Sequence, residues 1–100
     1  MKYDWDESKN RRNKDKHGIG FEDAVDVFED NSSLEFDANK NGEYRIVRIG
    51  KTATKYILFV VYTFRGVFVR LISARQASKS ERNLYIERKL KDQDDENTNS

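Results

Sequence analysis

The sequence predicts an α+β fold. The expected architecture is an antiparallel sheet, a meander of three to four strands plus a short N-terminal strand, with two N-terminal helices and one C-terminal helix. Three observations lead to it: helical apolar spacing near the N-terminus, a series of apolar runs between residues 34 and 75, and a helix-start motif after them. Segregated helices and strands, rather than a regular alternation of the two, are typical of α+β domains.

The N-terminal part contains one candidate strand and two candidate helices. Residues 2–5 alternate in polarity, as a short strand does. Asp6 can cap a charged helix that runs to about Lys16, and Gly18 suits the position just after its end. A second helix, amphipathic and ending near Asn31, is predicted by apolar residues spaced i, i+3, i+4 and i+7: Phe21, Ala24, Val25 and Phe28.

Four strands are expected next, at residues 34–37, 43–51, 56–64 and 67–75. Asn41-Gly42 and Arg65-Gly66 supply tight turns between them. The run 56–64 is apolar on both faces, which indicates a central strand covered on both sides.

The last element begins with Ser78 and Glu81, which have the spacing of a capping box. The helix that follows carries Leu84, Tyr85 and Leu90. We expect residues 1–91 to form a single domain, because a chain of 100 residues is too short for two independent cores. Residues 92–100 are polar and acidic and are expected to form a disordered tail.

Composition excludes several classes of protein. The chain has no cysteine and one histidine, so it can form neither a disulfide frame nor a thiolate or multi-histidine zinc site. No metal site and no cofactor are predicted. The N-terminus lacks the apolar stretch of a signal peptide, and the longest apolar run is too short to cross a bilayer. We therefore expect a cytoplasmic protein that does not contact the membrane.

Charge is strongly segregated along a chain whose net charge is only +1. Residues 21–37 carry seven acidic groups and no Lys or Arg, whereas residues 38–91 carry thirteen Lys or Arg against three Glu. A basic second half is what an RNA- or phosphate-binding face needs. A solvated surface with charges of both signs explains the same counts equally well.

Two separated groups of residues form one pattern along the chain. The N-terminal group is Trp5, Asp6, Lys9, Asn13, Lys16 to Ile19, Phe21, Glu22, Ala24, Val27 and Phe28. The C-terminal group is Arg70, Ile72 to Arg75, Ala77, Glu81, Arg82 and Tyr85. Between the two, the same pattern includes Glu43, Arg45, Gly50, Val60, Val61, Thr63 and Arg65. Together these residues resemble the BrnT family of toxins from type II toxin–antitoxin systems.

The resemblance covers roughly residues 3–86, and it implies a RelE/ParE-like fold and endoribonuclease activity. It further implies that the chain cleaves RNA and arrests translation. The implied partner is an antitoxin with a ribbon–helix–helix DNA-binding domain, in a heterotetramer that meets DNA only through the antitoxin. Related folds include toxins that act on DNA gyrase. The alternative is thus a non-enzymatic binding module, either gyrase-directed or an antitoxin-bound co-repressor.

RNA cleavage without a metal uses the substrate's own 2′-hydroxyl as nucleophile, and charge growing on the phosphate must be neutralised. Arg70 and Arg75 are the candidates for that task, because a guanidinium can meet two phosphate oxygens at once. Five positions separate them, so in a regular strand their side chains point to opposite faces of the sheet. They share a face only if the strand ends or bulges before Arg75. Arg70 could equally form a structural ion pair with Glu43 or Glu81.

His17 is the candidate acid or base, because only its ordinary pKa lies near neutrality. Its place at a helix C-terminus is also explained by the helix dipole alone. The candidate RNA-binding residues are Lys16, Arg48, Tyr62, Arg82 and Tyr85. The sequence leaves open that both tyrosines belong to the core, that Arg48 is a solvated strand residue, and that Arg82 and Tyr85 contact the antitoxin.

Overall fold

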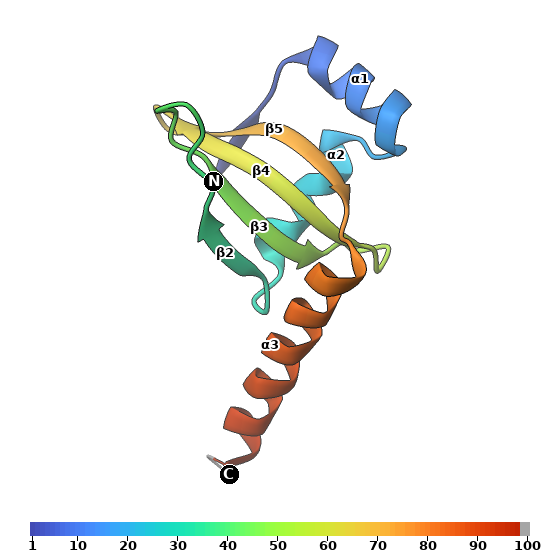
Figure 1. Cartoon of the computed structure of the whole chain (residues 1–100), viewed down its shortest axis with the longest axis vertical. Coiled ribbons are helices and arrows are strands. Elements are labelled where there is room, and N and C mark those ends of the chain that lie inside the picture. The colour runs from blue at the N-terminus through green and yellow to red at the C-terminus, as the bar shows by residue number, and fades with distance from the viewer. Residues whose placement is uncertain (99–100) are drawn as a thin grey trace.

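A computed structural model describes residues 1–98, with side chains described for residues 1–93. A five-stranded sheet and its helices make up the fold (Figure 1). The elements in chain order are β1 (Lys2–Asp4), α1 (Glu7–His17), α2 (Phe21–Ala24), the 3₁₀ helix η1 (Val25–Glu29), β2 (Leu34–Asp37), β3 (Ile46–Lys51), β4 (Ile57–Arg65), β5 (Phe68–Gln76) and α3 (Lys79–Thr98).

The sheet has the strand order β1-β5-β4-β3-β2. β2 to β5 form an antiparallel meander with β4 inside it, which confirms the predicted central strand. β1 pairs with β5 in parallel, so the sheet is mixed and the prediction of a purely antiparallel sheet was wrong.

The direction of β1 follows from the segment that continues it. β1 lies beside residues 68–70 of β5, and Asn13 of α1 bonds to Ala74, further along the same strand. Residues 2–17 therefore run beside β5 in one direction, first as a strand and then as a helix. Alternating polarity in the sequence identifies a strand but does not tell its direction or its neighbour.

A β-bulge interrupts the pairing of β4 with β5. Val61 is opposite Ser73 and Tyr62 is opposite Leu71, which leaves Ile72 as an extra residue in β5. An extra residue reverses the parity of all side chains beyond it. The bulge predicted as a condition for Arg70 and Arg75 to share a face is thus present.

The two faces of the sheet are covered differently. We call the face under α2 and η1 the helical face; its buried core includes Phe21, Ala24, Val27, Leu58, Val60, Tyr62, Val69, Leu71 and Ala74. The opposite face has a smaller buried cluster, made of Val47, Ile49, Ala77 and Tyr85. On this opposite face Phe59 and Val61 of the central strand stay half-buried, since α3 covers only one end of it and then extends away from the sheet (Figure 1).

Helix α1 contains no apolar residue and is held by two buried asparagines, Asn10 and Asn13. The side chain of Asn13 donates to the carbonyl of Ala74 at 2.7 Å and accepts from its amide at 3.2 Å. Asn10 accepts from the amide of Phe21 at 2.8 Å. Asn13 thus satisfies part of the edge of β5 that β1 leaves unpaired. The caps are as predicted, with Asp6 accepting from the amide of Lys9 and Gly18 left-handed at φ 71°.

The second predicted helix is shorter and tighter than expected. Instead of one α-helix to Asn31, α2 ends at Ala24 and a 3₁₀ turn, η1, continues to Glu29. Contacts with the sheet override local propensity here. Val27 in η1 lies so close to Gly50 of β3 that a Cβ on this glycine would meet it at 2.9 Å. The carboxylate of Asp30, just after η1, accepts from the amide of Lys51 at 2.8 Å.

Helix α3 begins with the predicted capping box. Ser78 N donates to Glu81 Oε1 at 2.7 Å, and Glu81 N donates to Ser78 Oγ at 3.3 Å. We expected a disordered tail from residue 92, whereas α3 continues to Thr98; residues 99–100 lie outside the described residues. Extending an anchored helix adds one hydrogen bond for each residue that is fixed, which lets a polar segment stay helical. In the described part of the chain, no helix is both long and apolar enough to span a membrane.

Replacing Asn13 with Ala leaves the buried amide and carbonyl of Ala74 without partners. We expect the free energy of unfolding to fall by about 3 kcal/mol, because each unsatisfied buried group costs about 1–3 kcal/mol. Urea unfolding of this variant and of Asn83→Ala, an exposed asparagine of α3, measures the difference. Equal stability losses in the two variants would contradict the proposed role of Asn13.

Candidate functional site

One hollow of about 360 Å³ is lined by four cationic side chains, those of Lys9, Arg45, Arg65 and Arg70. It lies where β4 ends and β5 begins, beside the segment that leads into β3 and beside α1. We call it the basic hollow; its lining residues are Lys9, Glu43, Arg45, Thr63, Phe64, Arg65, Arg70 and Ile72.

Strand register brings these residues together. Arg70 is opposite Thr63 in the pairing of β4 with β5, and the bulge at Ile72 follows directly. The hydroxyl of Thr63 donates to the carbonyl of Tyr44 at 2.8 Å. That bond fixes the segment that carries Glu43 and Arg45 against the end of β4.

Positive charge exceeds negative charge in the basic hollow. Arg45 pairs with Glu43 at 2.8 Å, and Arg70 pairs with Asp4 of β1 at 3.3 Å. Lys9 and Arg65 form no ion pair with any residue that the structure describes. The hollow therefore offers guanidinium and ammonium donors to an anionic ligand.

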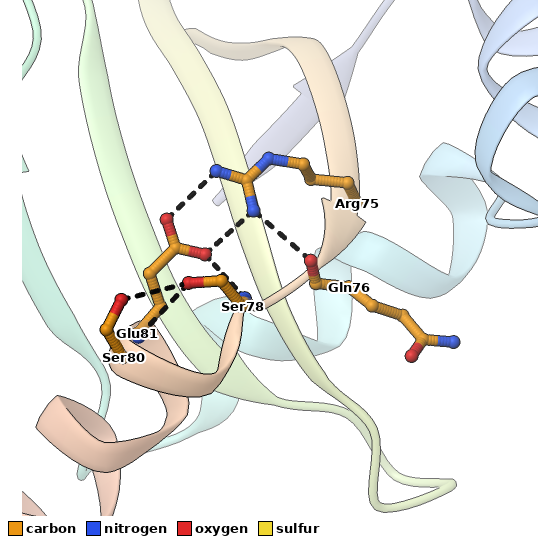
Figure 2. Close-up of polar contacts among 5 residues, drawn as sticks. All are labelled: Arg75, Gln76, Ser78, Ser80 and Glu81. Carbon is orange, nitrogen blue, oxygen red and sulfur yellow. Dashed lines mark hydrogen bonds and ion pairs between the residues drawn. The ribbon is translucent and has the colours of Figure 1, made fainter.

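Arg75 shares the face of Arg70, but both of its terminal nitrogens have partners within the protein. Its guanidinium forms two parallel bonds to Glu81, at 2.7 and 2.9 Å, and donates to the carbonyl of Gln76 at 3.2 Å (Figure 2). The same guanidinium lies 4.0 Å from the centre of the Phe59 ring. Glu81 also caps α3, so Arg75 fixes the start of this helix to the sheet. The sequence analysis named Glu81 as a possible ion-pair partner of Arg70. In the structure, Arg70 pairs with Asp4 instead.

The pKa of Glu81 falls from an ordinary value of 4.5 to about 2. The hydrogen bond from Arg75 is the largest cause, and those from Ser78 add to it against the opposing effect of burial. The carboxylate is thus charged over the whole physiological range.

His17 and Lys16 lie away from the basic hollow. His17 is the half-buried last residue of α1, one turn past Asn13, and Lys16 beside it is exposed. The residue of α1 that reaches the hollow is Lys9, two turns before His17.

Arg48, a candidate RNA-binding residue from the sequence, lies on the helical face and not with Arg70, which corrects the expectation that it binds RNA beside the other arginines. It is opposite Val60, a residue of the helical core. Its guanidinium donates to Ser33 Oγ at 2.6 Å and lies 5.0 Å from the centre of the Phe28 ring. The strand has no irregularity in this stretch, so parity alone decides the face.

Tyr62 and Tyr85 are core residues, with exposed fractions of 1% and 2%. The hydroxyl of Tyr62 donates to Glu35, and that of Tyr85 donates to Asp30 at 2.6 Å. Burial, followed by these carboxylates, raises the pKa of both phenols. Neither ring has a free face, which corrects the prediction that they stack on RNA. Arg82, in contrast, is exposed on α3.

The sequence analysis did not select three of the cations in the hollow, Lys9, Arg45 and Arg65. All three belong to the residues that carry the family resemblance, and that was the signal available. Every residue of the hollow except Phe64 belongs to that set. Charge and strand parity alone could not place these three cations, because they come from three separate parts of the chain.

Fold and site together define the class of protein: a small α+β domain with a cationic hollow at one end of a mixed sheet, suited to an anionic substrate. The family model described as "Ribonuclease toxin, BrnT, of type II toxin-antitoxin system" matches residues 5–81. The chain belongs to this family of ribonuclease toxins, and family membership implies an antitoxin partner.

A solved structure supports the assignment. The 1.1 Å crystal structure of the Brucella abortus ribonuclease toxin, BrnT, is similar with a TM-score of 0.64 and 30% sequence identity. The match covers 79% of this chain and 99% of that chain. No curated protein matches the chain.

Replacing Glu81 with Gln removes the charge of this side chain and so measures what its ion pair with Arg75 contributes to stability. A carboxyl with a lowered pKa stabilises the fold fully above its unfolded value, here 4.5, and this contribution is lost as pH falls through about 2. We expect Glu81→Gln to lower the free energy of unfolding by about 1–2 kcal/mol at pH 7.

The difference between this variant and the wild type should disappear toward pH 2. Glu87→Gln, on the exposed surface of the same helix, is the control. Chemical unfolding at a series of pH values gives the answer. A difference that stays constant with pH would show that the charge of Glu81 contributes nothing.

Proposed function

We propose that the chain is an endoribonuclease that uses the 2′-hydroxyl of its RNA substrate as nucleophile, needs no metal, and arrests translation. The basic hollow is its active site. The observation that carries this proposal is the convergence of residues from β4, β5, α1 and the segment before β3 on one cationic surface. Membership of a family of ribonuclease toxins supplies the reaction class.

Arg70 neutralises the charge that develops on the scissile phosphate. It is half-buried, with 26% of its side chain exposed, and only one of its nitrogens contacts Asp4. The remaining N–H groups can meet phosphate oxygens, and partial burial strengthens such a contact. Arg65 lies exposed beside it and binds the neighbouring phosphate.

Proton transfer falls to Glu43 and Lys9. The Glu43 carboxylate accepts the proton of the 2′-hydroxyl, and the Lys9 ammonium protonates the leaving 5′-oxygen. Both groups line the hollow together with Arg70, whereas His17 does not. Arg75 is a positioning residue in this scheme, because its fork is filled by Glu81. Lys16 and Arg82, both exposed cations, extend the RNA contact beyond the hollow.

The antitoxin that family membership implies is proposed to carry a ribbon–helix–helix domain and to form a heterotetramer with this chain. In that assembly the antitoxin binds DNA, and the present chain meets DNA only through it. Neutralisation follows if the antitoxin covers the basic hollow or holds its residues apart.

Arg70→Ala removes the phosphate contact while sparing the core. Induced in cells, the wild-type chain should arrest growth and produce new 5′ ends in total RNA that vanish when the antitoxin is co-expressed. The variant should do neither, with a melting temperature within a few degrees of the wild type. Arg88→Ala, which removes an arginine of α3, is the matched control and should stay toxic.

Full toxicity of Arg70→Ala would remove this residue from the active site. Growth arrest by the wild type without new RNA ends would instead indicate a target other than RNA, such as DNA gyrase.

A further inference from the structure

Large aromatic side chains are exposed beside the basic hollow. Phe64, near the end of β4, is 56% exposed, and Tyr44, just before β3, is 52% exposed. Phe36 of β2 is 43% exposed. These three rings share a second hollow, of about 550 Å³, whose other lining residues are Glu35, Asp37 and Ile46.

Phe64 belongs to both hollows, so it marks the boundary between them. The basic hollow lies on one side of it, with Arg65 and Arg70. The second hollow, on the other side, contains aromatic rings and carboxylates but no Lys or Arg. Thr63 bonds to the carbonyl of Tyr44 at 2.8 Å and thereby ties the two aromatic segments together.

Because the two hollows are lined differently, one suits the phosphate of a nucleotide and the other suits its base. A phosphate is attracted to the arginines and repelled by Asp37, which forms no ion pair with any residue that the structure describes; Glu35 is paired with Arg48 at 3.3 Å. A base is uncharged and has a flat apolar face that can stack on the aromatic rings. Its N–H groups can donate hydrogen bonds to a carboxylate. A nucleotide strand lying over Phe64 would thus place its phosphates in the basic hollow and its bases in the aromatic one.

We propose that Phe64 and Tyr44 form a stacking platform for unpaired bases, so that the site takes single-stranded RNA. The ligand is RNA because of the proposed ribonuclease function; the platform itself is argued from the aromatic rings and the charges. Bases in a duplex are stacked on each other and cannot reach these rings, whereas bases of a single strand can be splayed out.

Binding to a probe that cannot be cleaved tests the platform apart from catalysis. A short, fluorescein-labelled oligoribonucleotide with 2′-O-methyl groups is titrated, alone or annealed to its complement, and followed by anisotropy. The wild type should bind the single strand more tightly than the duplex. Phe64→Ala should weaken single-strand binding about tenfold, the loss expected from removing one stacked base. Phe64→Tyr should restore it.

Tyr56→Ala is the matched control, because Tyr56 is 56% exposed but precedes β4, at the opposite end of this strand from Phe64. It should bind as the wild type does. Ultraviolet crosslinking followed by peptide mapping should place the bound RNA on Phe64 or Tyr44.

Unchanged single-strand binding by both Phe64→Ala and Tyr44→Ala, or equal affinity of the wild type for single strand and duplex, would overturn the platform. Cleavage of unmodified RNA, measured in parallel, reports on the proposed function separately. A chain that cleaves RNA but binds both probes equally retains its function and loses the platform. A chain that binds the single strand but cleaves nothing retains the platform and loses the proposed function.

Discussion

The extra residue in β5, Ile72, determines which side chains meet on the sheet. Without the bulge, Arg70 and Arg75 would point to opposite faces, because five positions separate them. With it, Arg70 faces the same side as Thr63 while Leu71 and Ala74 both stay in the helical core. One inserted residue thus keeps the core apolar on one face and turns an arginine toward the basic hollow on the other.

Specific polar interactions position α1 and α3 against this sheet. Helix α1 is tied to the free edge of β5 by Asn13, and this places Lys9 at the rim of the basic hollow. Helix α3 is tied by the bidentate pair between Arg75 and Glu81 and by the bond from Tyr85 to Asp30. Such bonds are directional, so they define the orientation of α1, which has no apolar residue, and add to the burial of the Tyr85 ring in fixing α3.

The sequence allowed most elements to be predicted, since caps, turns and apolar periodicity are local. The helix caps at Asp6 and Gly18 are found where expected, and so is the capping box at Ser78. The direction of β1 and the 3₁₀ turn of η1 were missed, because both depend on contacts with strands distant in sequence. The residues that carry the family resemblance include almost all residues of the basic hollow. Only the strand register, however, shows which of them lie together there. The alternation of side chains along β3 places Arg48 on the correct face. The wrong expectation for Arg48 arose because its positive charge alone was used to group it with the RNA-binding residues.

The central claim is that the basic hollow cleaves RNA through the substrate's own 2′-hydroxyl. The most direct measurement is to incubate the purified chain with RNA in the presence of EDTA and determine the chemistry of the new ends. Attack by the 2′-oxygen expels the 5′-oxygen, so the account predicts 2′,3′-cyclic phosphate and 5′-hydroxyl ends with the metal removed. Ends bearing 3′-hydroxyl and 5′-phosphate, or cleavage that requires added metal, would contradict it.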